Sequence, residues 1–340
     1  MPDGYEVHAY RLVNANGVEL ITIEYGAAIL ALKVPDRNGK LDDVVLGYDT
    51  LEGYLNSPHY IGAVVGRCAG RIRNSRFQLD GVTYGLTENE SPHHLHGGLR
   101  GCDKWVWAGK PYEDDRGVGI DFAYYSLDDS EGYPGNLTVT VRYYLTHENV
   151  LMVNYFAQTD KATIVNLTQH TYWNLSGTTN PVLNHGLNIL ADRFLPIDSE
   201  KLPTGELATV ADTPFDFRHP KLIGAAFDVN YEQLRFGQGL DHCFELSKPM
   251  GELGEAGMLY DPASGRLLTV HTTEPGLQVY TGSALTGVGK YNLEMGPFSG
   301  ICLETQHFPD APGHPDFPSI VVRPGMAYQS STLFVFSVLG

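Results

Sequence analysis

Apolar and polar residues alternate along many short stretches of this chain, a pattern typical of half-buried β-strands. Between residues 137 and 145 every second residue is apolar, and 150–157 follows as a return strand after the turn-like residues 147–149. Three stretches near the carboxyl terminus carry the same strand signal: 267–271, 277–281 and 332–338. The pattern predicts a chain built mainly from antiparallel strands.

Three dipeptides mark tight turns between such stretches. Asn16-Gly17, Asn38-Gly39 and Asp80-Gly81 each separate two apolar segments. Asn or Asp followed by Gly favours the two-residue turns of β-hairpins, because these residues tolerate a positive φ. We therefore expect three hairpins in the amino-terminal part of the chain.

Sustained helical periodicity is nearly absent. The best candidate is a short helix that starts after Asp49 or Thr50 and extends to Leu55. No low-complexity linker or change in composition marks a boundary between domains. We expect one all-β domain over residues 1–340, a large antiparallel β-sandwich of two packed sheets.

The segment 166–175 has the most unusual pattern in the chain. Its even positions all carry hydrogen-bonding side chains, including His170, whereas its odd positions are mainly apolar but include Gln169 and Thr171. A strand with one polar, histidine-bearing face suits the wall of a cleft. Considered alone, such a segment is more often a core strand that contains a hydrogen-bonded histidine.

Composition and charge narrow the possible partners. Hydrophobic residues make up 42% and charged residues 19% of the chain, as expected for a soluble globular protein. The formal net charge of −17 argues against nucleic acid and anionic membranes as partners, since both require a basic surface. A neutral ligand suits this charge better than an anionic one.

The amino-terminal residues and the cysteines indicate a cytoplasmic protein. Residues 1–6 show no basic segment followed by an apolar run, and no apolar stretch is long enough to span a membrane. The cysteines are far apart and form no CxxC pair, so we expect reduced, buried thiols. They are Cys68, Cys102, Cys243 and Cys302.

Histidines and glycines are concentrated at residues 92–98. Gly97 and Gly98 permit a close approach of the backbone, which would let a neighbouring histidine face a ligand. In an extended segment His94 and His96 share one face and could bind a metal ion. Alternatively, one histidine polarises a substrate and the others lie at the surface.

Two carboxylates are further candidates. Glu304 follows an apolar run and precedes a polar turn, which would place it at the end of a strand. Asp241 lies two residues after Gly239 and could accept hydrogen bonds from ligand hydroxyls, or simply form a turn. A single Glu at a strand end is by default an exposed residue.

Cationic and aromatic side chains are less informative. Four arginines cluster within residues 66–77, and such a cluster usually indicates a solvated face: Arg67, Arg71, Arg73 and Arg76. The tryptophans fit a core as well as a platform for a sugar ring: Trp105, Trp107 and Trp173.

A set of short stretches in a fixed order gives these candidates a common interpretation. The stretches are 25–27, 35–37, 44–48, 61–67, 71–72, 95–98, 166–175, 203–205, 216–218, 241–242, 275–282, 303–306, 309–311 and 317–318. Each is weak alone, but together they closely resemble the aldose 1-epimerase (galactose mutarotase) family over nearly the whole chain.

The resemblance implies an isomerase of the galactose mutarotase type that interconverts the α and β anomers of free aldoses without a metal or nucleotide. Glu304 matches the general base of this family, His170 its general acid and His96 a supporting group at the ring oxygen. Three further positions match residues that hold sugar hydroxyls: Arg71, Asp241 and Gln278. The expected partner is a small free sugar, bound by a monomer or a homodimer.

The chain departs from this family at four positions. Gly70 stands where many relatives have Asn, which we expect to remove a hydrogen bond and to open space near the sugar. The other three departures are Gln169, Trp173 and Ser283 in place of Asn, Phe and Asn. We expect Gln169 to face away from His170. Because Gly70 lies next to the expected sugar site, the sequence does not determine which sugar is preferred.

For the reaction, we expect Glu304 and His170 to support each other as an ion pair across the cleft. A carboxylate raises the pKa of a nearby imidazole, and the resulting cation keeps the carboxylate ionised. Three alternatives stay open from sequence: an inactive sugar-binding or regulatory homologue, a related isomerase with a non-standard substrate, and a metal enzyme that uses His94, His96 and Glu304.

Overall fold

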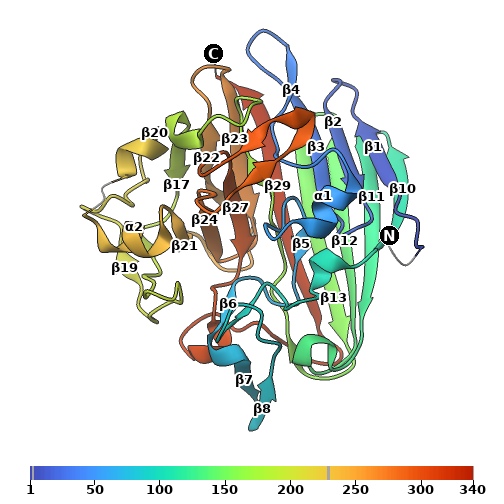
Figure 1. Ribbon diagram of the computed structural model, residues 1–340, viewed down its shortest axis with the longest axis vertical. Helices are drawn as coiled ribbons and strands as arrows, with labels where there is room; N and C mark the ends of the chain where they lie inside the picture. Colours follow the sequence, from blue (N-terminus) through green and yellow to red (C-terminus); the bar gives the residue numbers. More distant parts are fainter. Residues whose placement is uncertain (2–3, 228–229, 340) are drawn as a thin grey trace.

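Antiparallel strands make up most of the computed structural model, in which residues 1, 4–227 and 230–339 are described (Figure 1). The largest sheet has nine strands, in the order β10-β11-β12-β13-β29-β23-β22-β17-β20. Their bounds are β10 Ala108–Asp114, β11 Gly117–Ser126, β12 Leu137–Thr146, β13 Val150–Thr159, β29 Ala327–Val338, β23 Arg266–Thr272, β22 Gly254–Tyr260, β17 Gly186–Ile189 and β20 Lys221–Leu222.

A second sheet of six strands has the order β16-β27-β24-β21-β18-β19. Its strands are β16 Tyr172–Trp173, β27 Ile301–Gln306, β24 Gly276–Tyr280, β21 Asp241–Glu245, β18 Arg193–Phe194 and β19 Ala208–Thr209. A third sheet at the amino terminus contains β1 Ala9–Val13, β2 Glu19–Ile23, β3 Ile29–Pro35 and β4 Leu41–Asp43. These two sheets lie in front of the nine-stranded sheet in Figure 1.

Pairs of short strands complete the sheet structure. They are β15 Thr168–Gln169 with β5 Val64–Val65, β6 Arg71–Ile72 with β9 His94–Leu95, β7 Arg76–Leu79 with β8 Val82–Gly85, β14 Thr163–Ile164 with β28 Val321–Val322, and β25 Gly287–Val288 with β26 Glu294–Met295. All of these pairs are antiparallel.

Helices are short. Among the residues that the structure describes, the two α-helices are α1 Leu51–Asn56 and α2 Glu232–Gly237. Single turns of 3-10 helix lie at η1 Arg73–Ser75, η2 Cys102–Lys104, η3 Ser130–Gly132, η4 Val182–Asn184, η5 Ile223–Ala226, η6 Lys290–Asn292 and η7 Ala311–Gly313. Within the described residues, no helix combines the length and the apolar character that crossing a membrane would require.

One hydrophobic core joins the three larger sheets. It contains Val141 and Val153 from the nine-stranded sheet, Leu32 from the amino-terminal sheet, and Leu277 and Leu303 from the six-stranded sheet. Burying a side chain of this size stabilises the fold by about 1.5–3 kcal/mol. Because side chains alternate along a strand, the even-numbered residues of β24 and β27 face away from this core. That outer face carries the candidate site.

Most predicted elements are confirmed. The three Gly-containing dipeptides form the turns of β1–β2, β3–β4 and β7–β8, and the strands expected at 137–145 and 150–157 are β12 and β13. Thr50 caps α1 by accepting a hydrogen bond from the backbone N–H of Gly53. The fold is mostly β with antiparallel sheets, as the alternation predicts.

The prediction of one continuous strand over 166–175 is wrong. The segment splits into β15, which pairs with β5, and β16, which pairs with β27. Both faces are buried. Most polar side chains bind neighbouring backbone, whereas His170 and Tyr172 also line a cavity. The Oγ1 of Thr168, for example, donates to the carbonyl oxygen of Thr305. Between the two strands, His170 hydrogen-bonds through its backbone to Gly62 and Ala63.

Candidate active site

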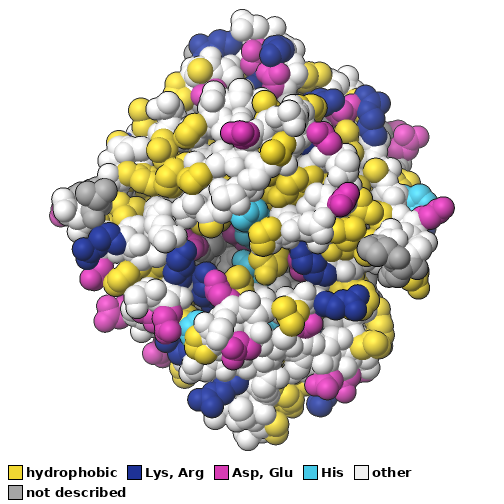
Figure 2. All heavy atoms as spheres, viewed as in Figure 1, with side chains coloured by type: hydrophobic (Ala, Val, Ile, Leu, Met, Phe, Trp, Pro, Cys, Tyr) yellow, Lys and Arg dark blue, Asp and Glu magenta, His cyan; other side chains and the backbone are white. Residues whose placement is uncertain are grey.

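A cavity of about 220 Å³ opens on the outer face of the six-stranded sheet. Figure 2 shows a hollow near the centre of this view, with histidine inside it and charged side chains around it. Its polar lining consists of His59, Arg71, Glu90, His96, His170, Lys201, Asp241, Gln278, Glu304 and Gln306. Tyr, Pro and aliphatic residues form the rest of the wall. This is a pocket for a small, polar ligand.

Adjacent strands place three of the predicted residues side by side on the cavity floor. Gln278 of β24 pairs in register with Glu304 of β27. On the other side of β24, the Nε2 of Gln278 donates to the Oδ1 of Asp241 at 2.8 Å. The sheet therefore holds an amide between two carboxyl groups, and all three side chains face the cavity.

The opposite wall comes from β6 and β9. Arg71 begins β6, and its guanidinium makes two hydrogen bonds to the carboxylate of Glu90, at 2.6 and 2.9 Å. Burial opposes the charge on Arg71, but the nearby Asp241 and Glu90 outweigh it and raise the pKa of the guanidinium. Arg71 thus stays a fixed cation at the cavity wall.

His96 follows β9 and has a defined tautomer. Its backbone has a positive φ of 50°, and the backbone N–H of Gly70 donates to its Nδ1 at 3.2 Å. Burial, together with the charges of His170 and Arg71, lowers the pKa of His96 well below its ordinary value. The ring is therefore neutral with its hydrogen on Nε2, which makes His96 a donor to a ligand oxygen.

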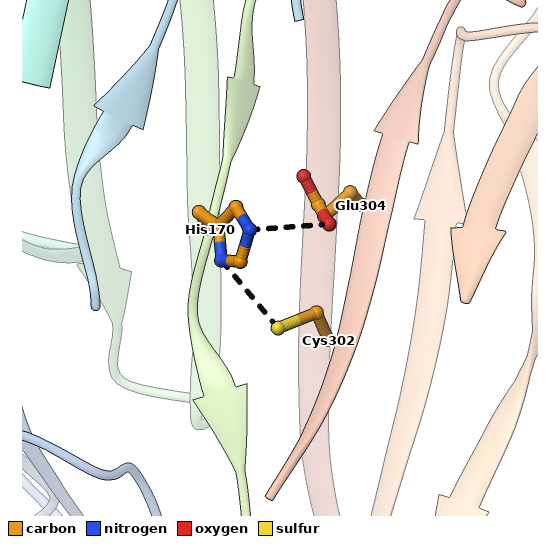
Figure 3. Close-up of side chains that lie close together, drawn as sticks. All are labelled: His170, Cys302 and Glu304. Carbon is orange, nitrogen blue, oxygen red and sulfur yellow. Dashed lines mark hydrogen bonds and ion pairs between the residues drawn. The ribbon is translucent and has the colours of Figure 1, made fainter. Parts of the chain in front are cut away.

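His170 and Glu304 meet at the bottom of the cavity (Figure 3). The Nε2 of His170 lies 3.7 Å from the Oε1 of Glu304. Both residues are buried: His170 is 4% exposed and Glu304 is 2% exposed. The other carboxyl oxygen of Glu304, Oε2, has no hydrogen-bond partner among the described residues. A buried carboxyl oxygen without a partner is rare and indicates a place for a ligand hydroxyl.

The expected ion pair between these two residues is not supported by their pKa shifts. Burial, aided by the charge of Asp241, raises the pKa of Glu304 well above its ordinary value. Burial lowers the pKa of His170 to about 4. Taking both charges out of water is more costly than their attraction returns at 3.7 Å. These shifts favour the neutral pair, with the proton on the carboxyl group and the imidazole uncharged.

The structure also corrects the predicted position of Glu304 and the predicted shared face of His94 and His96. Glu304 is not an exposed residue at a strand end, because β27 continues to Gln306 and buries it. His94 and His96 do not share a face. The ring of His94 is hydrogen-bonded on one side to the carbonyl oxygen of Thr87 and on the other to the hydroxyl of Tyr133. Both nitrogens of His94 are thus occupied, which removes the metal site proposed on His94, His96 and Glu304.

A different group of three residues comes close enough to be considered for a metal ion. The side chains of His170, Cys302 and Glu304 offer ligand atoms within 4.8 Å of one another. However, Cys302 lies beside the Nδ1 of His170 and Glu304 beside its Nε2 (Figure 3). One ion can bind only one nitrogen of an imidazole, so this arrangement fits proton transfer better than ligation.

Two of the four clustered arginines, Arg67 and Arg71, do not belong to a solvated face, whereas Arg76 is exposed. Arg67 is 3% exposed, and its guanidinium donates to the hydroxyl of Ser126 and to the carbonyl oxygens of Pro134 and Leu127. Arg71 lines the cavity. None of the tryptophans lines the cavity, and Trp107 and Trp173 are fully buried in the core.

Gly70 opens less space than expected. It lines the cavity with a φ of 77°, and a Cβ at this position would lie 3.0 Å from the Cβ of Pro309. The first atom of any side chain there would therefore press against the ring of Pro309. Gln169 faces away from the cavity, as expected, and donates to the carbonyl oxygen of Gly62.

Several cavity residues were not found from sequence. Tyr60 stacks on His170 and lies edge-on to His96, with ring centroids 5.9 and 4.8 Å apart. The Nζ of Lys201 lies 3.7 Å from the Oδ2 of Asp241. Glu90 and Lys201 stand in polar loop sequence without periodicity, so no local pattern distinguishes them from surface residues.

The glycine at position 97 fixes the loop that carries His96. Its φ is 91°, and a Cβ there would lie 1.7 Å from the carbonyl oxygen of Gly66. We expect Gly97→Ala to lower the midpoint of thermal unfolding by several degrees, because both the clash and the strained φ oppose folding. Gly85→Ala is the matched control, since a Cβ at Gly85 meets no atom within 4 Å. Equal melting temperatures for the two variants would contradict this account.

Comparison with known proteins gives a consistent result. The family model "Aldose 1-epimerase" matches residues 8–335. Galactose mutarotases from Bos taurus and Homo sapiens are each 45% identical over 322 residues, covering 93% of this chain and 90% of theirs. The aldose 1-epimerase of Escherichia coli (strain K12) is 36% identical over 338 residues, covering 98% and 96%.

Two solved structures of related proteins have the same fold as this chain. An aldose epimerase homologue from C. elegans superposes with a TM-score of 0.91 at 30% identity, covering 98% of this chain and 100% of that one. A galactose 1-epimerase from Lactobacillus acidophilus superposes with a TM-score of 0.87 at 29% identity, covering 98% and 99%.

Proposed function

Because the chain belongs to the aldose 1-epimerase family, we propose that Glu304 and His170 move the two protons by which it interconverts the α and β anomers of a free aldose. The observation that carries this proposal is a buried carboxyl group with an unpartnered oxygen, 3.7 Å from a buried imidazole, at the bottom of a sugar-sized cavity. A ligand hydroxyl that enters the cavity can reach both groups.

The reaction needs one base and one acid. Glu304 removes the proton from the hydroxyl on C1, the bond from C1 to the ring oxygen breaks, and His170 gives a proton to that oxygen. The open aldehyde then turns about its C1–C2 bond, and the same steps in reverse close the ring on the other face. Every proton is returned, so Glu304 and His170 are restored after each turnover.

The pair works with one proton between its two members. In the ring-closed complex the proton is on His170, and in the ring-opened complex it is on Glu304. Burial by the protein favours the second arrangement, because it disfavours both charges. A sugar hydroxyl bonded to the free oxygen of Glu304 stabilises the carboxylate, and so it shifts the proton to His170. Substrate binding thereby converts the pair into the carboxylate and imidazolium that the first proton transfers require.

Four other residues are suited to hold the sugar. The Nε2–H of His96 can donate to the ring oxygen, which helps it to leave C1. Arg71 is held in position by Glu90 and can donate to hydroxyls. Asp241 and Gln278 hydrogen-bond to each other at 2.8 Å and retain donor and acceptor capacity toward the cavity.

The activity is tested by polarimetry. Freshly dissolved α-D-galactose or α-D-glucose should reach its equilibrium rotation faster with the protein than in buffer alone. Rates for galactose, glucose, xylose and arabinose then rank the substrates. A rate equal to that in buffer for all four sugars would contradict the proposed function and favour a sugar-binding homologue.

Asp241→Asn should change both binding and pH dependence. Asp241 raises the pKa of Glu304 through its charge, and the pair loses its shared proton above that pKa. Removing the charge lowers the pKa, so the alkaline limb of the kcat profile should move to lower pH. KM should rise as a hydroxyl acceptor is lost. Asp121→Asn, at the exposed pair with Arg142, is the control and should leave both quantities unchanged. An unmoved alkaline limb in Asp241→Asn would contradict the coupling.

We also propose that the protein works in the cytoplasm, as a single domain over residues 1–340, on a small free sugar and as a monomer or homodimer. The four cysteines support the compartment, since all are free and buried. Unpaired thiols fit a reducing environment.

A further inference from the structure

Cys302 lies beside one ring nitrogen of His170 and Glu304 beside the other (Figure 3). The two residues are separated by one position on β27, so their side chains face the same way and meet the same imidazole. The Sγ of Cys302 is 3.5 Å from Nδ1, and the Oε1 of Glu304 is 3.7 Å from Nε2. The thiol is fully buried and does not line the cavity. It contacts the proton-transfer residue without reaching the ligand.

Proton exchange at Nε2 requires a hydrogen on Nδ1. A neutral imidazole that is protonated on Nε2 has its free electron pair on Nδ1, and it cannot take up the proton of Glu304 from the cavity side. The competent neutral ring carries its hydrogen on Nδ1, and the cation carries hydrogens on both nitrogens. An acceptor beside Nδ1 therefore favours the competent form at every stage of the reaction.

Cys302 supplies the side-chain acceptor at this position. The rings around His170 contact it by packing: centroid distances are 5.9 Å to Tyr60, 5.3 Å to His96 and 5.0 Å to Tyr172. His59 lowers the pKa of His170 slightly through its charge. The backbone carbonyl of His170 is a further acceptor that raises the pKa of the ring, and the same oxygen accepts the N–H of Gly62.

We propose that Cys302 is a positioning residue for the epimerase reaction: its sulfur accepts the Nδ1–H of His170 and holds the imidazole in the tautomer that exchanges a proton at Nε2. This inference rests on the proposed role of His170. Burial and the charge of Glu304 raise the pKa of Cys302 well above its ordinary value, so the sulfur is a neutral thiol. A neutral thiol is a weak acceptor. It orients the ring without fixing the positive charge, which leaves the Nε2 proton easy to release.

Three variants separate positioning from packing. Cys302→Ala removes the acceptor, Cys302→Ser replaces it by a hydroxyl, and Cys68→Ala is the control. Cys68 is equally buried, but its Sγ bonds to the carbonyl oxygen of Ala69 and not to His170. For each protein, kcat, KM and the pH dependence of kcat are measured by polarimetry. The tautomer of His170 in the resting enzyme is read from its ¹⁵N chemical shifts.

We expect Cys302→Ala to lower kcat by about 10-fold with little change in KM, in the range seen when a group that orients a catalytic imidazole is lost. The acid limb of its profile should move to lower pH, because the imidazolium loses an acceptor. Cys302→Ser should recover most of kcat and move the acid limb to higher pH, since oxygen is the better acceptor. Cys68→Ala should leave kcat unchanged, together with the acid and alkaline limbs of its pH profile.

The nitrogen shifts should show a hydrogen on Nδ1 of His170 in the unmodified protein and its loss from Nδ1 in Cys302→Ala. A bare Nδ1 in the unmodified protein would overturn the inference, as would equal effects of the Cys302 and Cys68 variants. If Cys302→Ala does not fold, the kinetics of Cys302→Ser and the ¹⁵N chemical shifts of the unmodified protein test the inference. Failure of the proposed function is distinct, because it appears as absent mutarotation in the unmodified protein.

Discussion

Glu304→Gln should lower kcat for mutarotation by about 10²- to 10⁴-fold, the range typical of losing a well-placed proton-transfer group. Gln has the same shape but cannot take the proton from the hydroxyl on C1. Such a loss corresponds to roughly 3–5 kcal/mol of transition-state stabilisation. The sugar should still bind, because Arg71, Asp241 and Gln278 are unchanged. Polarimetry gives kcat, and calorimetric titration with the sugar shows whether binding persists.

Glu274→Gln is the matched control for this variant. Glu274 is also a buried carboxyl group beside a histidine, with its Oε2 2.5 Å from the Nδ1 of His307, but it does not line the cavity. Its replacement should lower stability and leave the kcat of the folded protein unchanged. Mutarotation at the normal rate by Glu304→Gln would remove Glu304 from the mechanism.

His170→Asn should produce a loss of similar size and should also change the pH profile. In the unmodified protein kcat/KM, which reports the free enzyme, falls in acid as the imidazole of His170 becomes protonated near its pKa of about 4. Below that pH both members of the pair are protonated and no base remains. The Asn variant should lose this acid limb together with most of its activity. The residual rate is measured by polarimetry from acid to neutral pH.

His94→Asn is the control for His170→Asn. It breaks the hydrogen bonds to Thr87 and Tyr133 and should lower the thermal midpoint, but the folded protein should keep its kcat. Combining Glu304→Gln with His170→Asn should cost little more than either change alone, because the two residues act as one unit. Full additivity of the two losses in free energy would indicate that they act in separate steps.

The predictable part of the fold was encoded in local patterns. The hairpin dipeptides and the alternation in 137–145 depend only on neighbouring residues, and all of them formed as expected. The segment 166–175 was mispredicted because its hydrogen-bond partners, such as the carbonyl oxygen of Thr305, are distant in sequence. Alternation alone cannot tell a strand from two short strands that share a polar face.

The candidate site could likewise be predicted only in part from the sequence. Resemblance to a family indicated six residues, and the fold places all six around one cavity: Arg71, His96, His170, Asp241, Gln278 and Glu304. The electrostatics of the pair could not be predicted, because the pKa of Glu304 depends on burial that only the folded chain creates. The contact between Cys302 and His170 likewise requires β27 to pass the segment between β15 and β16.

The floor of the cavity is the outer face of a sheet whose inner face belongs to the core, so neighbouring residues of β27 serve different purposes. Leu303 is packed among apolar side chains while Glu304 faces the sugar. A slip of one residue in this strand would put a carboxyl group into the protein interior and a leucine under the substrate. The part of the wall formed by the loops at Gly70 and Lys201 is under no such register constraint. Sugar preference can therefore diversify from that wall while the chemistry on the sheet stays the same.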